Sequence, residues 1–237
     1  MTEELKGQVA VVTGAARGIG EAISKQLAAM GATVILVARD KGRLEQVRKE
    51  IEAAGGSAHT APLDLLEEAA IAQLGKTIQG QHGRCDILVN NAGIGLIGNP
   101  LVEMEPSDWD TVMGTNLRGP YLMIRALAPL MIAAKSGHII NISSLAGKNP
   151  LPNGAAYSAS KWALNGLTYS VAEELRPYNI RVSVVAPGSV NTGFGSSKQD
   201  NPRKIQPEDV ARVVAMLVTQ APQSFVSEVL LRPTQKP

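Results

Sequence analysis

The sequence is poor in the residues that build metal sites and disulfides. It contains one cysteine, Cys85, and three histidines among 237 residues. One thiol cannot form an intramolecular disulfide, and no pairing of cysteine with histidine has the spacing of a zinc site. We therefore expect a reduced interior without a metal. The net charge is only +2, from 23 basic and 21 acidic residues, so the basic excess of a nucleic-acid-binding protein is missing as well.

Long apolar stretches are also missing. No run approaches the roughly 20 residues that a helix needs to cross a bilayer. Residues 1–14 (MTEELKGQVAVVTG) have neither a basic n-region nor a signal-peptide core, so we expect a cytoplasmic protein with no membrane partner. Aromatic residues make up only 3% of the chain, but hydrophobic residues make up 44%, which is enough for a sizeable core.

Short β-branched segments alternate with longer helical patterns. The clearest strands are predicted at 9–12, 33–37, 87–89, 139–142 and 182–185. They are apolar at consecutive positions, which is typical of a parallel sheet covered by helices on both faces. No repeat or linker divides the chain. Residues 1–237 are therefore predicted to form one α/β domain, a Rossmann-type doubly wound parallel sheet flanked by helices on both faces.

The helical patterns fall between these strands, at 21–30, 41–54 and 66–79. A longer helical region opens at Pro106, where Ser107 or Asp108 is the expected cap, and it is expected to bend near Gly119 and Pro120. The segment 191–207 is rich in Gly, Ser, Asn and Pro and follows a strand end, so it is either a substrate loop or an ordinary exposed connection.

A glycine-rich turn follows the first strand. In Thr13–Gly20 (TGAARGIG), Gly14 permits a tight turn, Gly18 lets the backbone approach a pyrophosphate, and Gly20 allows close packing of helix on strand. Glycine clusters alone are weak evidence, because turns use glycine without any ligand. Here the cluster lies where a strand turns into a helix, which predicts a dinucleotide site.

The second strand end carries Arg39 where NAD-binding folds usually have an acidic residue. Asp40 is close, but it precedes a helical pattern and fits a helix cap. Arg39 and Arg17 suit a 2′-phosphate, because guanidinium groups offer forked donors to phosphate oxygens. NADP(H) is therefore expected over NAD(H), the alternative being that both arginines are solvated surface charges.

Tyr157 and Lys161 lie one turn apart on a helical pattern that runs to about residue 176. A free phenol has a pKa of about 10, too high for ready proton exchange at neutral pH. An ammonium about 4 Å away would favour the phenolate by up to roughly 4 kcal/mol, so we expect Lys161 to lower the pKa of Tyr157. Ser144, at the end of the fourth strand in this list, places a hydroxyl at the same edge of the sheet.

Together these motifs resemble the short-chain dehydrogenase/reductase family over almost the whole chain. The resemblance rests on TGAARGIG, on Asp64 at the expected end of a strand, on NNAG at 90–93, and on the residues Asn116, Ser144, Tyr157, Lys161, Pro187, Gly188 and Thr192. The chain ends without the Asp-Gly-Gly that is frequent in the family.

The resemblance implies a role for each of four catalytic residues. Tyr157 would be the proton donor in carbonyl reduction and the base in alcohol oxidation. Lys161 would bind the nicotinamide ribose and lower the tyrosine pKa, and Ser144 would anchor the substrate oxygen. Asn116 would hold a water that connects the lysine to solvent, although it could also only bond the backbone where the helix bends.

The resemblance also implies a set of cofactor-binding residues. Asp64 would meet the adenine, Asn90 and Asn91 would border the adenosine ribose, and Asn90 could alternatively brace neighbouring strands. The complete expected set is Gly14, Ala16, Arg17, Gly18, Ile19, Gly20, Arg39, Asp64, Leu65, Asn90, Asn91, Ala92, Gly93, Tyr157, Lys161, Pro187, Gly188, Val190 and Thr192.

The predicted function is therefore reversible hydride transfer between NADP(H) and a small-molecule carbonyl or alcohol. A reductase of 3-oxoacyl thioesters and a catalytically silent NADP(H)-binding regulatory protein are alternatives. Tetramers are common in the family, and Tyr121–Ala134 is apolar around most of its circumference, which fits either a homo-oligomer interface or the core of one subunit.

The remaining notable residues are expected to be structural. Ser143 is one of them, and Trp109 and Trp162 are expected to pack inside the protein. The histidines His59, His82 and His138 share no spacing and are expected at the surface or in loops.

Overall fold

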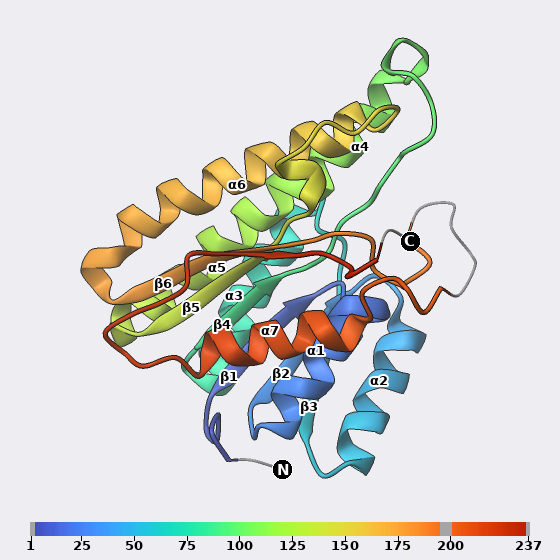
Figure 1. Cartoon of the computed structure of the whole chain (residues 1–237). Helices are drawn as coiled ribbons and strands as arrows, with labels where there is room; N and C mark the ends of the chain where they lie inside the picture. Colours follow the sequence, from blue (N-terminus) through green and yellow to red (C-terminus); the bar gives the residue numbers. More distant parts are fainter. Residues whose placement is uncertain (1–2, 195–200, 236–237) are drawn as a thin grey trace.

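The computed structural model describes residues 3–194 and 201–235. Within them the chain forms a parallel sheet of seven strands in the order β3-β2-β1-β4-β5-β6-β7 (Figure 1). The strands are β1 (Val9–Thr13), β2 (Thr33–Ala38), β3 (Ser57–Pro62), β4 (Ile87–Asn90), β5 (Gly137–Ile142), β6 (Ile180–Pro187) and β7 (Glu228–Leu231). The predicted α/β fold with a doubly wound parallel sheet is confirmed.

Helices cover both faces of the sheet and create two apolar cores. One face packs against α1 (Gly18–Ala29), α2 (Lys41–Ala53) and α7 (Pro207–Val218). The other packs against α3 (Glu68–His82), α5 (Gly119–Ala134) and α6 (Ala155–Leu175). Because every residue of β1, β4 and β5 is buried, these strands cannot alternate between apolar and polar positions.

The strand order reverses its direction of growth between β1 and β4. β1 pairs with β2 on one side and with β4 on the other, so the connections that leave these two strands diverge at the carboxyl edge of the sheet. In doubly wound folds this switch point opens a crevice for ligands.

The end of β3 differs from the sequence expectation. β3 has the sequence SAHTAP and is too polar to stand out among the strands, which fits its place at the edge of the sheet. It ends at Pro62, before the expected end at Asp64. The Asp64 carboxylate instead accepts a hydrogen bond of 3.0 Å from the amide of Leu66, and α3 begins only at Glu68.

Helix caps explain two further boundaries. Asp40 caps α2 as expected, since its carboxylate accepts from the Arg43 amide at 3.0 Å. The cap expected at Ser107 or Asp108 is wrong, because α4 (Pro106–Met113) starts at the proline and both residues lie inside its first turn. Proline needs no partner for a missing N–H, so the helix starts there without a side-chain cap.

The long helical region is interrupted earlier than the predicted bend. A π-helical turn, Gly114–Arg118, separates α4 from α5 and contains the buried Asn116. Pro120 then lies in the first turn of α5, where proline fits a helix. Leu122, Met123 and Leu127 of α5 are buried within this chain, so core packing accounts for much of its apolar surface.

Three residues are placed differently from the expectation. Trp109 and Trp162 are 36% and 53% exposed, so they are not core residues. His138 lies buried in β5, where its Nε2 is 2.8 Å from the Ser183 hydroxyl on β6. That hydroxyl donates to the Val226 carbonyl at 2.7 Å. A buried polar pair between strands leaves no spacing signal in the sequence.

The other two histidines lie close to each other, and the only cysteine is buried. His59 is exposed on β3, and its ring lies 5.4 Å from that of His82 at the end of α3. Cys85 is a buried free thiol, and burial raises its pKa to about 12, so it is unreactive at neutral pH. In the described part of the chain, every helix is too short or too polar to cross a bilayer.

Burial of His138 predicts acid sensitivity. Burial lowers its pKa from 6.5 to about 3, so the folded state keeps the ring neutral. Below pH 6.5 the ring binds a proton in the unfolded state but not in the folded state. As the pH falls, the free energy of unfolding therefore decreases by up to roughly 1.4 kcal/mol per pH unit. We expect His138→Gln to flatten this loss between pH 6.5 and 4, measured by urea unfolding at each pH. Equal slopes in both proteins would contradict the assignment.

Candidate active site

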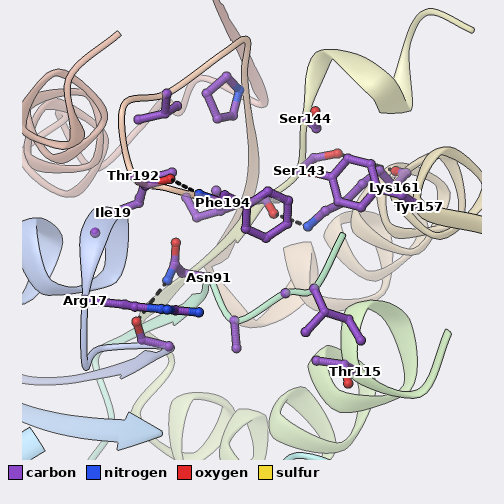
Figure 2. Close-up of a pocket in the computed structure, with 18 of the residues that line it drawn as sticks. Arg17, Ile19, Asn91, Thr115, Ser143, Ser144, Tyr157, Lys161, Thr192 and Phe194 are labelled. Atoms are coloured by element: carbon purple, nitrogen blue, oxygen red, sulfur yellow. Dashed lines mark hydrogen bonds between the residues drawn. The ribbon is translucent and has the colours of Figure 1, made fainter. Parts of the chain in front are cut away.

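A cavity of about 1070 Å³ opens at the carboxyl edge of the sheet, around the switch point between β1 and β4. It is lined by the residues that follow β1, β2, β4, β5 and β6 and by the start of α6 (Figure 2). All but three of the predicted site residues line it. The exceptions are Gly20, Asn90 and Asn116.

The glycine turn after β1 has no room for side chains. Gly14 has φ +67°, and a Cβ placed there would lie 2.8 Å from the Asn91 amide nitrogen. At Gly20 a Cβ would lie 2.3 Å from the Gly14 carbonyl oxygen, so this glycine allows α1 to pack against the turn and does not face the cavity. Arg17 precedes α1, and Gly18 and Ile19 of its first turn line the cavity, where helix amides can meet an anion.

The loop after β4 is fastened to the end of β1. The Thr13 hydroxyl accepts from the amides of Asn91 and Ala92 at 2.9 and 3.0 Å. The Asn91 side chain donates to the Thr13 carbonyl at 2.9 Å. These bonds hold the two walls of the crevice at a fixed separation.

One end of the cavity is rich in arginine. Arg17, Arg39 and Arg43 line it together with Asp40 and Asp64. The Arg39 guanidinium lies 3.5 Å from Asp64 and is 74% exposed, so it is free to reorient. Arg43 was not among the cofactor-binding residues predicted from the sequence. It lies one turn after Asp40, the cap of α2, and its guanidinium is 3.5 Å from the Asp40 carboxylate. Three guanidinium groups against two carboxylates give this end a positive excess, which suits a phosphate.

Asn90 does not reach the cavity. Its side chain is buried and donates to the Asn141 side chain of β5 at 2.8 Å. Asn141 in turn donates to the Thr168 hydroxyl of α6 at 2.9 Å. The side chain therefore braces neighbouring strands, the structural role left open in the sequence, and a contact of Asn90 with a ribose stays a prediction.

Asn116 is buried in the π-helical turn and bonds to the backbone. Its carbonyl oxygen accepts from the Ile94 amide at 2.8 Å, and its nitrogen donates to the Ile94 carbonyl at 2.9 Å and to the Ser160 hydroxyl at 3.1 Å. These contacts match the structural alternative and fix the loop after β4. A role in holding water stays a prediction.

Tyr157, Lys161 and Ser144 meet at the other end of the cavity (Figure 2). The amine of Lys161 is buried and donates to the Ile142 carbonyl at the end of β5, at 2.9 Å. It also lies 5.8 Å from the centroid of the Tyr157 ring. Ser143 is buried beneath this group, and its hydroxyl donates to the Lys161 carbonyl at 3.4 Å, which agrees with a structural role.

The pKa of Tyr157 shifts in the direction opposite to the sequence expectation. Burial raises it, and hydrogen bonding with the Ser144 side chain only partly offsets that rise. Burial also lowers the pKa of Lys161 to about 8, because the low-dielectric surroundings disfavour the ammonium. The attraction expected between the two groups is opposed by their common desolvation. Tyr157 is consequently protonated at neutral pH, as a proton donor must be.

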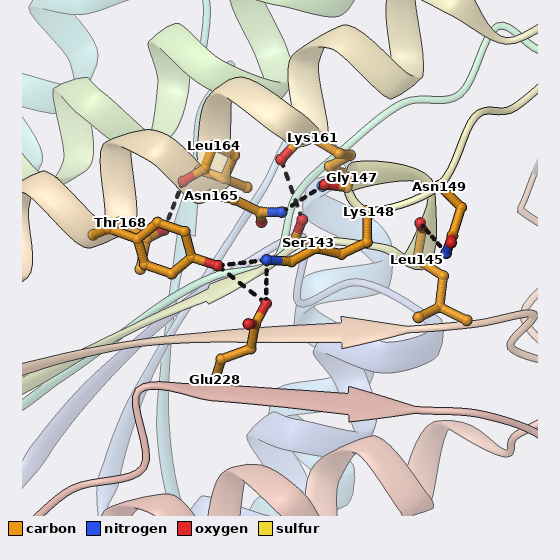
Figure 3. Close-up of polar contacts among 11 residues, drawn as sticks. Ser143, Leu145, Gly147, Lys148, Asn149, Lys161, Leu164, Asn165, Thr168 and Glu228 are labelled. Carbon is orange, nitrogen blue, oxygen red and sulfur yellow. Dashed lines mark hydrogen bonds and ion pairs between the residues drawn. The ribbon is translucent and has the colours of Figure 1, made fainter.

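The segment that carries Ser144 is tied to α6 and β7 (Figure 3). Ser144 caps the 3-10 turn Leu145–Gly147, since its hydroxyl accepts from the Ala146 amide at 3.1 Å. Asn165 of α6 donates to the Gly147 carbonyl at 2.9 Å. Lys148 then lies 2.7 Å from both the Glu228 carboxylate of β7 and the Tyr169 hydroxyl of α6. Contacts on two sides therefore hold the Ser144 hydroxyl near the phenol.

Several cavity residues gave no signal in the sequence. They include Ile94, Ile97 and Leu151 in loops, Thr115 in the π-helical turn and Leu145 in the 3-10 turn after β5. Of the predicted loop 191–207, Thr192, Phe194 and Lys204 line the cavity, and residues 195–200 lie outside the described residues.

Comparison with known proteins agrees with this geometry. The short chain dehydrogenase family model matches residues 8–203. An uncharacterized oxidoreductase of Staphylococcus epidermidis is 33% identical over 97% of this chain and 99% of its own length. Its counterpart in Staphylococcus saprophyticus is 34% identical over the same shares. The chain belongs to the short-chain dehydrogenase/reductase family, a family of oxidoreductases.

Two solved structures are similar over nearly the full chain. A metagenomic short-chain oxidoreductase in complex with NADP is 57% identical, with a TM-score of 0.89, and the match covers 98% of this chain and 100% of that one. An alcohol dehydrogenase of the archaeon Thermococcus sibiricus, complexed with 5-hydroxy-NADP, is 30% identical, with a TM-score of 0.90 and coverage of 97% and 98%.

The lowered pKa of Lys161 predicts how stability depends on pH. The folded state binds this proton less tightly than the unfolded state, so its penalty is complete below about pH 8 and vanishes as pH rises toward 10.5. Relative to Lys161→Met, wild type should therefore gain stability between pH 8 and 10, by up to roughly 1.4 kcal/mol per pH unit. Urea unfolding of both proteins across this range measures it. A difference that is constant with pH would show that the amine titrates normally.

Proposed function

We propose that this protein is an NADP(H)-dependent oxidoreductase that interconverts a carbonyl compound and the corresponding alcohol. The observation that carries the proposal is the layout of one cavity. The glycine turn and three arginines lie at one end, and a buried phenol, an amine and a hydroxyl lie at the other. NADP(H) has its 2′-phosphate at the adenosine end, its pyrophosphate in the middle and its reactive ring at the other end, so it fits this layout.

The residues present fit the dinucleotide. The first turn of α1 would meet the pyrophosphate, and the absence of Cβ atoms at Gly14 and Gly18 keeps the backbone open there. Arg17, Arg39 and Arg43 would bind the 2′-phosphate, and Lys161 the ribose of the nicotinamide. When bound, the cofactor supplies or accepts the hydride.

Side chains of the protein would supply and remove the proton on the substrate oxygen. In reduction, Tyr157 donates its phenolic proton to the carbonyl oxygen while the Ser144 hydroxyl donates a hydrogen bond to the same atom. The Lys161 amine, anchored on Ile142, stabilises the phenolate that remains. In alcohol oxidation Tyr157 must first lose its proton, and its raised pKa makes that direction faster at higher pH.

We expect the protein to act as a homo-oligomer in the cytoplasm. Tyr121 of α5 and Trp162 and Tyr169 of α6 are large and exposed, which favours a contact between copies. Light scattering of the purified protein measures the assembly.

Replacing Tyr157 by phenylalanine should abolish catalysis and preserve binding. Without the phenolic proton we expect kcat for ketone reduction to fall by roughly 10²-fold to 10⁴-fold. NADPH affinity, measured by fluorescence titration, should stay within a few-fold, since the ring remains. Equal turnover by both proteins would remove Tyr157 as the donor. NADPH binding by wild type without turnover of any ketone or 3-oxoacyl thioester would instead indicate a silent binding protein.

The arginine cluster should control the choice of cofactor. We expect Arg39→Ala and Arg43→Ala each to weaken NADPH binding by about 10-fold, because a charge-assisted bond to phosphate is lost, and to leave NADH binding unchanged. Arg212→Ala is the matched control, because Arg212 is an exposed arginine of α7 that does not line the cavity. An unchanged ratio of NADPH to NADH affinity would exclude the tested residue from the 2′-phosphate site.

A further inference from the structure

The cavity beyond Tyr157 has apolar walls drawn from three loops. Ile97, after β4, and Leu151, after β5, both approach Gly154 at the start of α6, since a Cβ built there would lie 3.5 Å from Ile97 and 2.7 Å from Leu151. Phe194, after β6, is the third wall, with its ring centroid 5.7 Å from that of Tyr157. We name the space between these three side chains and the phenol the substrate chamber.

The ring of Phe194, which follows β6, lies against the loop after β4 and beside the ring of Tyr157 (Figure 2). A Cβ built on Gly95 would lie 2.6 Å from Cε1 and 3.0 Å from Cζ of the Phe194 ring. Gly95 is not among the residues with positive φ, so its backbone does not require glycine. The ring restricts this position instead, because any side chain at 95 would displace Phe194.

In the part of the chain that the structure describes, Lys161 and Lys204 are the charged side chains that line the cavity outside its arginine-rich end, and the polar residues Asn149 and Thr115 are neutral. Asn149 and Thr115 line the cavity, and the Asn149 side chain already donates to the Leu145 carbonyl at 3.1 Å. Lys148, in the same loop as Leu151, is paired with Glu228 and does not line the cavity. A charged substituent packed against Ile97, Leu151 and Phe194 would lose its hydration, and none of these three side chains could pair with it.

We propose that Phe194 and Gly95 together set the substrate specificity, and that the substrate is an uncharged ketone, or its alcohol, with one small substituent and one aryl or cycloalkyl substituent. The larger substituent packs on Phe194, Ile97 and Leu151, and the ring of Phe194 favours a tilted aromatic contact like the one it makes with Tyr157. The position of Phe194 against Gly95 limits the size of that substituent. This inference rests on the proposed function and adds the substrate class to it.

A pair of matched substrates tests the class. Methyl 4-acetylbenzoate and 4-acetylbenzoate have the same carbonyl and differ in the charge at the far end. We expect kcat/KM with NADPH to be at least 10-fold higher for the ester, and acetophenone to exceed 2-butanone by a similar factor. Equal or faster reduction of the carboxylate, or of 2-butanone, would overturn the assigned class.

A double-mutant cycle tests the wall. Relative to acetophenone, we expect kcat/KM for 2-acetonaphthone to rise at least 5-fold in Phe194→Ala and to fall at least 5-fold in Gly95→Ala. The added methyl group acts mainly by displacing the ring, since its other tight contact is Ile97 Cδ1 at 3.3 Å, so Phe194→Ala with Gly95→Ala should stay close to Phe194→Ala alone. Independent effects of the two changes, or an unchanged substrate ratio in Phe194→Ala, would overturn the proposed wall.

Two controls match these changes. Val102→Ala removes an apolar side chain that is 93% exposed in the loop after β4, and Gly166→Ala adds a methyl group on α6 where no atom lies within 4 Å. Both should keep the wild-type ratio. Phe194 is 42% exposed, so its removal should not unfold the protein, and NADPH titration checks each variant.

The proposed function and this inference fail in different ways. NADPH binding with no turnover of any ketone defeats both. Turnover whose substrate ratios do not depend on Phe194 defeats only the inference and leaves carbonyl reduction standing.

Discussion

The hydrogen bond from the buried Lys161 amine to the Ile142 carbonyl is the contact on which the rest of the site depends. It joins the first turns of α6 to the end of β5 and places the amine at the loop after β4, where a Cβ on Gly93 would lie 3.5 Å from Nζ. Tyr157, one turn earlier on α6, is thereby directed into the cavity. Removing an amine from water is unfavourable, as its lowered pKa shows, and the carbonyl at the strand end compensates for part of that loss.

Much of the fold could be predicted from the sequence because the pattern of apolar residues matches the layers of the structure, a buried sheet between two layers of helices. Strands buried on both faces are apolar at most consecutive positions, and β1, β4 and β5 were found for that reason. The end of β3 was expected at Asp64 instead of Pro62, because an edge strand carries polar residues and its bounds do not stand out. The cap of α4 was misplaced because Pro106 makes a side-chain cap unnecessary, a choice that composition alone does not reveal.

In the site, too, the residues that belong to local motifs could be predicted from the sequence, and the properties that depend on the folded surroundings could not. The glycine turn, Arg39, Ser144, Tyr157 and Lys161 could be identified because their chemistry is local, and the fold brings them to one cavity. The side-chain partner of Asn90 could not be predicted because a strand residue points to either face, and only the register shows that it meets Asn141. The sequence also predicted the wrong direction for the pKa shift of Tyr157, because desolvation depends on all the residues that pack around the phenol.

Scaffold and selectivity are carried by different parts of this protein. The groups that would move protons stand on a helix and at a strand end, locked by bonds to α6 and β7, whereas Ile97, Leu151 and Phe194 stand on connections that contribute nothing to the ladder between strands. Exchange of those loop side chains leaves both apolar cores intact. Such a separation gives the architecture evolutionary latitude, because a lineage can acquire new preferences by drift in three short segments without endangering the ability to fold.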